Sequence, residues 1–82
     1  MTNEEKHKAD VQFLIECLTK DLTVMLMNNY NFDADKALEL VYTSNTYKKL
    51  ENEATGLYYE SSIYVFDYLT KELNLEYKEV IA

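Results

Sequence analysis

The sequence predicts an all-α fold, a compact bundle of about four helices that forms one domain over residues 1–82. Two observations support this prediction. Apolar residues recur at intervals of three and four in three separate segments, which is the spacing of helices with one core-facing side. Proline is absent and Gly56 is the only glycine, whereas a β-rich chain of 82 residues would need several turns built on these two residue types.

The first helix is expected to end at about Asn28. Nothing before that residue breaks a helix, and three of the four residues from 28 to 31 are asparagines, which favour turns. Its core-facing side is predicted from the spacing of Val11, Leu14, Ile15, Leu18, Leu22, Met25 and Leu26. A polar flank beside this apolar side is expected to consist of Gln12, Glu16, Thr19 and Thr23.

The second helix is expected to begin after Asp33, a good N-cap residue that follows the apolar Phe32. One apolar face of this helix would consist of Ala34, Ala37, Leu38, Val41 and Tyr42. After a turn over residues 43–45, a short third helix is predicted from Tyr47 to about Ala54, and Gly56 closes that segment.

The last helix is predicted from Ile63 to about Leu75, with an N-cap in the segment Glu60-Ser61-Ser62. Its main apolar face would consist of Val65, Phe66, Leu69 and Leu73, with Ile63 at the edge. The tail over residues 76–82 is expected either to extend this helix or to pack back on the bundle through Tyr77, Val80 and Ile81.

Part of the chain resembles a group of short, uncharacterised bacterial proteins with all-helical folds. The resemblance covers residues 22–73 and lies in the segments 36–42 (KALELVY) and 55–62 (TGLYYESS), followed by Tyr64-Val65 and Tyr68-Leu69. Some proteins of that group lie beside toxin or mobile-element genes. The resemblance therefore implies a bacterial helical bundle, with a toxin-neutralising or regulatory role as one expectation, and it brings no catalytic residues.

Two helices carry more apolar surface than one core-facing side requires. On the first helix, Phe13, Cys17, Val24 and Met27 form a second stripe that also contains Lys20. On the last helix, Tyr64, Tyr68 and Leu75 form a second face. A helix that is apolar on two sides needs to be covered on both. Either the third helix and the tail cover the first helix, or one of these faces contacts another chain. We favour the second interpretation, with a homodimer or a dedicated protein partner.

Composition argues against a nucleic-acid or membrane-surface partner. The chain has 15 acidic residues, 8 lysines and no arginine, for a net charge of −7. Binding to a phosphate backbone or to anionic lipid needs a basic patch, and the lysines here are dispersed. A DNA-binding helix–turn–helix built from residues 34–53 is the alternative function that the helix lengths allow.

The sequence predicts neither an enzyme nor a cofactor or metal site. Catalysis needs a positioned acid, base, nucleophile or metal ion, yet His7 is the only histidine and Cys17 is the only cysteine. The charged N-terminal segment lacks the apolar run of a secretory signal, and no apolar run approaches the roughly 20 residues of a membrane span. A cytoplasmic location is therefore expected.

Overall fold

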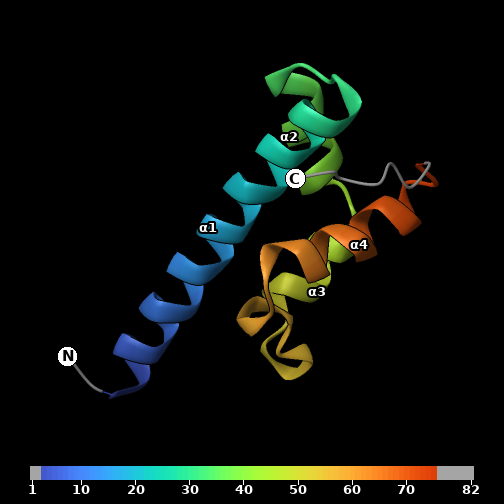
Figure 1. Ribbon diagram of the computed structural model, residues 1–82. Coiled ribbons are helices and arrows are strands. Elements are labelled where there is room, and N and C mark those ends of the chain that lie inside the picture. The colour runs from blue at the N-terminus through green and yellow to red at the C-terminus, as the bar shows by residue number, and fades with distance from the viewer. Residues whose placement is uncertain (1–2, 76–82) are drawn as a thin grey trace.

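The computed structural model describes residues 3–75, and it describes side chains from Asp10 onwards. Within these residues lie α1 (Asn3–Tyr30), α2 (Ala34–Tyr42), α3 (Asn45–Glu51), two short 3-10 turns, η1 (Glu53–Thr55) and η2 (Leu57–Tyr59), and α4 (Ser62–Glu72). No strand occurs in this range, so the predicted all-α bundle of about four helices is confirmed (Figure 1). The tail over residues 76–82, with Tyr77, Val80 and Ile81, lies outside the described residues.

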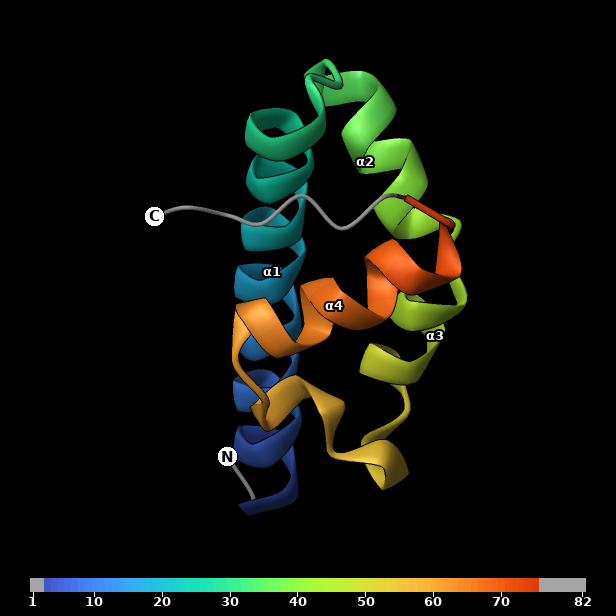
Figure 2. The ribbon, with the colours of Figure 1, turned by 45° about the vertical axis from the view of Figure 1, so that its right-hand side comes forward.

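Helix α1 is the longest element, and the other helices pack against it. Its 28 residues span about 42 Å at the helical rise of 1.5 Å per residue, which matches the longest dimension of 43 Å. Helix α2 packs beside the C-terminal end of α1, whereas α4 crosses α1, and α3 lies beside α4 and also contacts α1 (Figures 1 and 2). All the shorter elements therefore lie to one side of α1.

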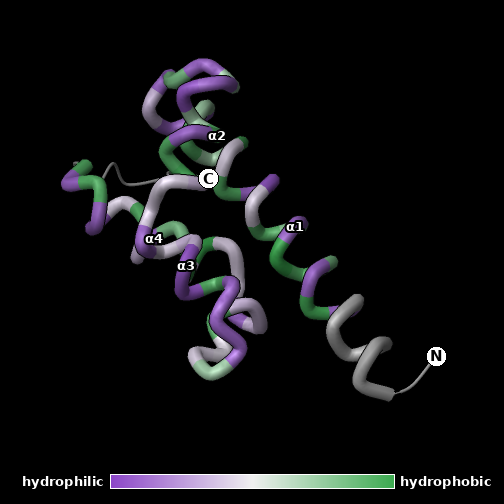
Figure 3. Tube along the Cα trace, turned by 180° about the vertical axis from the view of Figure 1, so that it is seen from behind, coloured by the Kyte–Doolittle hydropathy of each residue, from purple (hydrophilic) through white to green (hydrophobic). Residues whose placement is uncertain are grey.

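The core-facing side of α1 is the one predicted. Along α1, hydrophobic segments alternate with hydrophilic ones (Figure 3). Buried apolar residues come from every α-helix and from η2: Val11, Ile15, Leu18, Leu22, Leu26, Ala37, Val41, Leu50, Leu57, Tyr58, Val65, Phe66 and Leu69. Leu14 and Met25 are half-buried at the margin of this core.

The predicted polar flank of α1 is wrong at two positions, because Thr19 and Thr23 are buried. The Thr19 hydroxyl donates a hydrogen bond to the Ile15 carbonyl at 2.7 Å, and the Thr23 hydroxyl donates to the Thr19 carbonyl at 2.8 Å. A threonine whose hydroxyl is satisfied within its own helix presents only its methyl group to a neighbour. The buried side of α1 is therefore wider than its aliphatic residues indicate.

Side-chain caps set the starts of the three shorter helices. Asp33 Oδ1 accepts a hydrogen bond from the Lys36 amide at 2.8 Å, which confirms the predicted N-cap of α2. Ser44 Oγ accepts from the Tyr47 amide at 3.0 Å, and Ser61 Oγ accepts from the amide of the third helical residue of α4 at 3.2 Å. Because Ser44 is the cap, α3 begins at Asn45, two residues before its predicted start.

The segment between α3 and α4 differs from the prediction. Helix α3 ends at Glu51, because Asn52 leaves the helical conformation and its side chain caps η1 instead. Gly56 then adopts a left-handed conformation (φ 64°) between η1 and η2. Turn η2 buries Leu57 and Tyr58, two core residues that the sequence analysis did not identify.

Helix α4 ends at Glu72, three residues before its predicted end. Asn74 adopts the left-handed conformation (φ 59°), the Leu75 amide donates to the Thr70 carbonyl, and the Asn74 amide donates to the Lys71 carbonyl. These two hydrogen bonds define a Schellman C-cap, which turns the chain back toward the helix. Leu75 consequently packs, half-buried, against the core.

Candidate protein interaction surfaces

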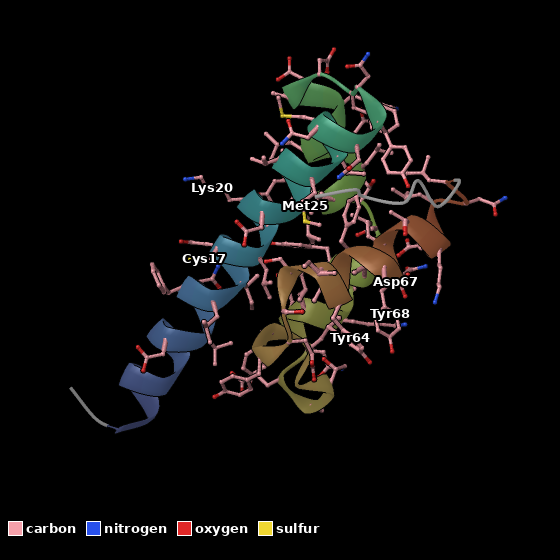
Figure 4. The ribbon with its side chains drawn as sticks, viewed as in Figure 1. Cys17, Lys20, Met25, Tyr64, Asp67 and Tyr68 are labelled. Carbon is pink, nitrogen blue, oxygen red and sulfur yellow. The ribbon has the colours of Figure 1, made fainter. Side chains whose placement is uncertain are left out.

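The second apolar stripe of α1 faces solvent in the described structure. We call Phe13, Cys17, Val24 and Met27 the α1 stripe. The Phe13 side chain is 65% exposed and that of Val24 is 44% exposed. Cys17 is also exposed, whereas Met27 is half-buried against the core. Cys17 and Lys20 project from the side of α1 that faces away from α4 (Figure 4).

Other elements contact both flanks of α1 and leave the stripe between them open. On one flank, the Ser62 hydroxyl at the start of α4 donates a hydrogen bond to Asp21 Oδ2 at 2.5 Å. On the other flank, Tyr47 of α3 lies close enough to Glu16 to respond to its charge. Burial raises the pKa of Tyr47, and the nearby carboxylates of Glu51 and Glu16 raise it further. The described part of the chain thus frames the α1 stripe without covering it.

Two tyrosines form a second exposed surface on α4, and we call Tyr64 and Tyr68 the tyrosine surface. Their rings meet edge to face, 5.2 Å between centroids, and their hydroxyls lie 3.3 Å apart. The hydrogen bond with Tyr68 raises the pKa of Tyr64, and the charge that Tyr68 would carry when ionised raises it further. The Lys49 ammonium lies 5.6 Å from the centroid of the Tyr68 ring, a cation–π contact from α3 to α4.

A shallow hollow adjoins the tyrosine surface. Its volume is about 170 Å³, and its walls are Lys49, Thr55, Leu57, Glu60, Tyr64 and Tyr68. Leu75, which the sequence analysis placed on the same face, is not there because α4 ends before it. The structure therefore keeps Tyr64 and Tyr68 together and separates Leu75 from them.

The carboxylate of Glu72 is a connection that sequence reasoning missed. One oxygen accepts a hydrogen bond from the Asn45 amide at 2.7 Å, and the other accepts from the Thr46 amide at 2.8 Å and the Thr46 hydroxyl at 2.7 Å. Burial raises the pKa of Glu72, but these hydrogen bonds and the positive charge of Lys49 lower it by more, so the net shift is downward. These contacts link the C-terminal end of α4 to the N-terminal end of α3, and this is a structural role.

Among the described residues, no three His, Cys, Asp or Glu side chains are close enough together to hold a metal ion. The side chain of His7 lies outside the described side chains. Within residues 3–75, no helix is both long enough and apolar enough to cross a membrane. Comparisons with protein-family models, curated proteins and solved structures find no match to this chain.

Proposed function

We propose that this protein works through protein–protein contact, and that two copies form a homodimer by pairing their α1 stripes. The exposure of Phe13 and Val24 on the side of α1 opposite the core carries the proposal. Complete burial of a large apolar side chain contributes roughly 1.5–3 kcal/mol. A two-fold pairing would cover both side chains on both copies, and the aliphatic stem of Lys20 would lie along the seam with its ammonium in water.

The tyrosine surface is the weaker candidate because its polar groups already have partners. The Tyr64 and Tyr68 hydroxyls form a hydrogen bond with each other, and the Lys49 ammonium lies over the Tyr68 ring. Covering these groups would remove water from an ammonium and two hydroxyls, which costs free energy unless a partner replaces those contacts. The side chains of the α1 stripe consist of carbon and sulfur atoms, and Lys20 beside it can keep its ammonium in water, so covering the stripe carries little such cost.

The contacts of α3 count against the alternative function in DNA binding. A recognition helix needs its N-terminal end and its cationic side chains free to meet the nucleic acid. Here the Glu72 carboxylate occupies the N-terminal end of α3, and Lys49 lies over Tyr68. Both arrangements lower the positive potential that a phosphate backbone requires. We therefore retain the interaction proposal, which assigns neither a reaction nor a cofactor to the chain.

Sedimentation velocity from low micromolar to near-millimolar concentration tests the homodimer. We expect a reversible monomer–dimer equilibrium for the wild type. The double variant Phe13→Glu/Val24→Glu should bind itself about 100-fold more weakly, because each two-fold contact loses apolar burial and gains a buried charge. Tyr64→Glu is the matched control, since Tyr64 is 47% exposed and Val24 is 44% exposed. This control should leave the equilibrium unchanged.

Circular dichroism of each variant checks that the helices remain folded, so that lost association is not lost structure. A wild type that stays monomeric at every concentration would overturn the homodimer. In that case, a dedicated protein partner or residues 76–82 of the same chain would be the group that covers the α1 stripe. Loss of association in Tyr64→Glu alone would instead show that the tyrosine surface is the interface.

A further inference from the structure

We infer that two tyrosines and two glutamates, contributed by three helices, form a site that binds an arginine side chain of a different protein. We call these residues the tyrosine–glutamate corner: Tyr42 of α2, Tyr47 and Glu51 of α3, and Glu16 of α1. None of them belongs to the α1 stripe or to the tyrosine surface. The inference therefore goes beyond the homodimer and holds for a monomeric chain as well.

The two tyrosine rings of the corner meet edge to face where α2 is followed by α3. Their centroids lie 5.0 Å apart, with an angle of 71° between the rings, and the Tyr42 side chain is 53% exposed. The turn between Tyr42 and Tyr47 is fixed by Ser44, whose hydroxyl accepts from the Tyr47 amide at 3.0 Å and donates to the Val41 carbonyl at 2.6 Å. The pair is therefore in place before a partner binds, which lowers the entropic cost of binding.

The charges around this tyrosine pair are negative. Glu51 of α3 and Glu16 of α1 lie close enough to Tyr47 for their charges to act on its hydroxyl. Burial raises the pKa of Tyr47, and the charges of Glu51, Tyr42 and Glu16 raise it further, whereas no lysine acts on it. The corner therefore combines an exposed aromatic ring with two carboxylates that come from different helices.

The lysines nearest in sequence leave both carboxylates unpaired. Lys20 follows Glu16 by one helical turn, and Lys48 precedes Glu51 by three residues. Neither lysine forms an ion pair with either glutamate; the ion pair found among the described side chains lies on α4 instead. Since Glu16 and Glu51 are also exposed, both carboxylates are available to a cation from another molecule.

The tyrosine surface on α4 shows which kind of group such a pair accepts. Its two rings have nearly the same geometry, with centroids 5.2 Å apart and an angle of 70°. There the Lys49 ammonium of the same chain lies 5.6 Å from the centroid of the Tyr68 ring. Over Tyr42 and Tyr47, by contrast, no cation lies among the described side chains. The corner thus repeats the aromatic arrangement and adds two carboxylates, and a partner has to supply the cation.

Arginine fits this corner better than lysine does. The planar guanidinium group can stack on a tyrosine ring while the N–H groups at its edges donate to carboxylates on two sides, whereas a lysine ammonium is a compact point charge. This chain contains no arginine, so a second copy of it cannot supply the group. Its net charge of −7 also attracts a basic surface over a distance. The partner is therefore a different protein that carries an arginine in a basic segment.

Fluorescence anisotropy of labelled hexa-arginine, titrated with the full-length protein at about 0.15 M salt, tests the site. Hexa-lysine carries the same charge, and we expect it to bind about threefold more weakly. Tyr42→Leu removes the exposed ring and should weaken hexa-arginine binding about threefold, which corresponds to the loss of one exposed cation–π contact. Tyr42→Phe keeps the ring and should bind hexa-arginine as the wild type does.

Charge variants test the two carboxylates. Glu16→Gln/Glu51→Gln should raise the dissociation constant for hexa-arginine about tenfold. Asp10→Asn/Glu53→Gln is the matched control, because it removes the same charge from two exposed residues outside the corner, and it should raise the dissociation constant less than about twofold. Circular dichroism checks the fold of each variant. Because Glu16 and Glu51 are exposed, this comparison remains available even if Tyr42→Leu unfolds.

Three results would overturn the site. Equal weakening in the two charge variants would show that the peptide responds only to the net charge of the chain. Unchanged binding in a folded Tyr42→Leu would show that the ring takes no part. Binding of hexa-lysine as tight as that of hexa-arginine would show that the guanidinium group is not selected. A monomeric wild type in sedimentation velocity would overturn the homodimer alone and leave the arginine site in place.

Discussion

Glu72 shows how one side chain can join two helices that are distant in sequence. Its carboxylate accepts three hydrogen bonds from Asn45 and Thr46 at the start of α3. Because these bonds favour the ionised form, the pKa of Glu72 in the folded chain lies below its value in the unfolded chain. The resulting stability is fully present above the unfolded pKa and is lost as the pH falls through the folded pKa.

We predict that Glu72→Gln lowers the free energy of unfolding by about 1 kcal/mol at neutral pH, in the range of a lost helix cap. The difference between wild type and variant should begin to shrink as the pH falls below the ordinary glutamate pKa of about 4.3, and it should be smallest below the lower folded pKa of Glu72, where the wild-type carboxylate is protonated as well. Urea unfolding followed by circular dichroism at neutral and acidic pH measures both values. Asp67→Asn, which breaks the exposed ion pair with Lys71, is the control and should change stability little at either pH.

At the scale of elements, the sequence predicts those features whose signal is local. The start of α2 follows from Asp33 and its position before an apolar face, and the core side of α1 follows from the spacing of residues such as Leu18 and Leu22. The exposure of Phe13 and Val24 agrees with their assignment to a second side of α1. Such features depend on residues within one or two helical turns, which is the range that periodicity reports.

Features that depend on distant contacts or on very short turns could not be predicted. Turns η1 and η2 have three residues each, too few to show any periodicity. Leu75 continues the apolar spacing of α4, and only the left-handed backbone of Asn74 ends that helix. Glu72 accepts hydrogen bonds from Asn45 and Thr46, which lie 27 and 26 positions earlier in the chain. No local sequence pattern indicates hydrogen bonds over such a separation.

Gly56 is a position at which backbone conformation limits substitution. Its φ of 64° favours glycine, and a Cβ added there would meet no atom within 4 Å, so any cost comes from the backbone alone. We predict that Gly56→Ala destabilises the fold by about 1 kcal/mol and that Gly56→Asn costs less, because asparagine tolerates this conformation. Thermal unfolding of the two variants makes the comparison. Equal stability of Gly56→Ala and wild type would contradict the assigned conformation.

The two sides of α1 should respond differently to the loss of side-chain volume. Leu22 is fully buried, so Leu22→Ala should lower the free energy of unfolding by about 2–5 kcal/mol. Val24→Ala removes a half-exposed side chain and should cost under about 1 kcal/mol in dilute protein, where the chain is monomeric. Urea unfolding at low micromolar concentration distinguishes the sides. Similar losses at both positions would mean that the α1 stripe is covered within the chain.

At the scale of the whole molecule, the homodimer and the stability of the chain are linked. A chain of 82 residues buries only roughly 60–65% of its unfolded surface, and the described part of this one leaves Phe13 and Val24 exposed. Association that covers these residues in the folded state but not in the unfolded chain stabilises folding by mass action. Protein concentration should therefore act on the stability of this protein as a ligand concentration would.

The final prediction follows from that linkage. Each tenfold increase in concentration above the dissociation constant adds about 0.7 kcal/mol per chain to the folded state, which raises Tm by roughly 3–5 °C for a domain of this size. We expect this rise for the wild type and for Tyr64→Glu, because the tyrosine surface is not the proposed interface. Phe13→Glu/Val24→Glu should show no such rise at the concentrations at which the wild type does, because it binds itself about 100-fold more weakly. Differential scanning calorimetry over a hundredfold concentration range makes the measurement. A wild-type Tm that stays constant over this range would show that association contributes nothing to folding, and the α1 stripe would then have no stabilising role in a homodimer.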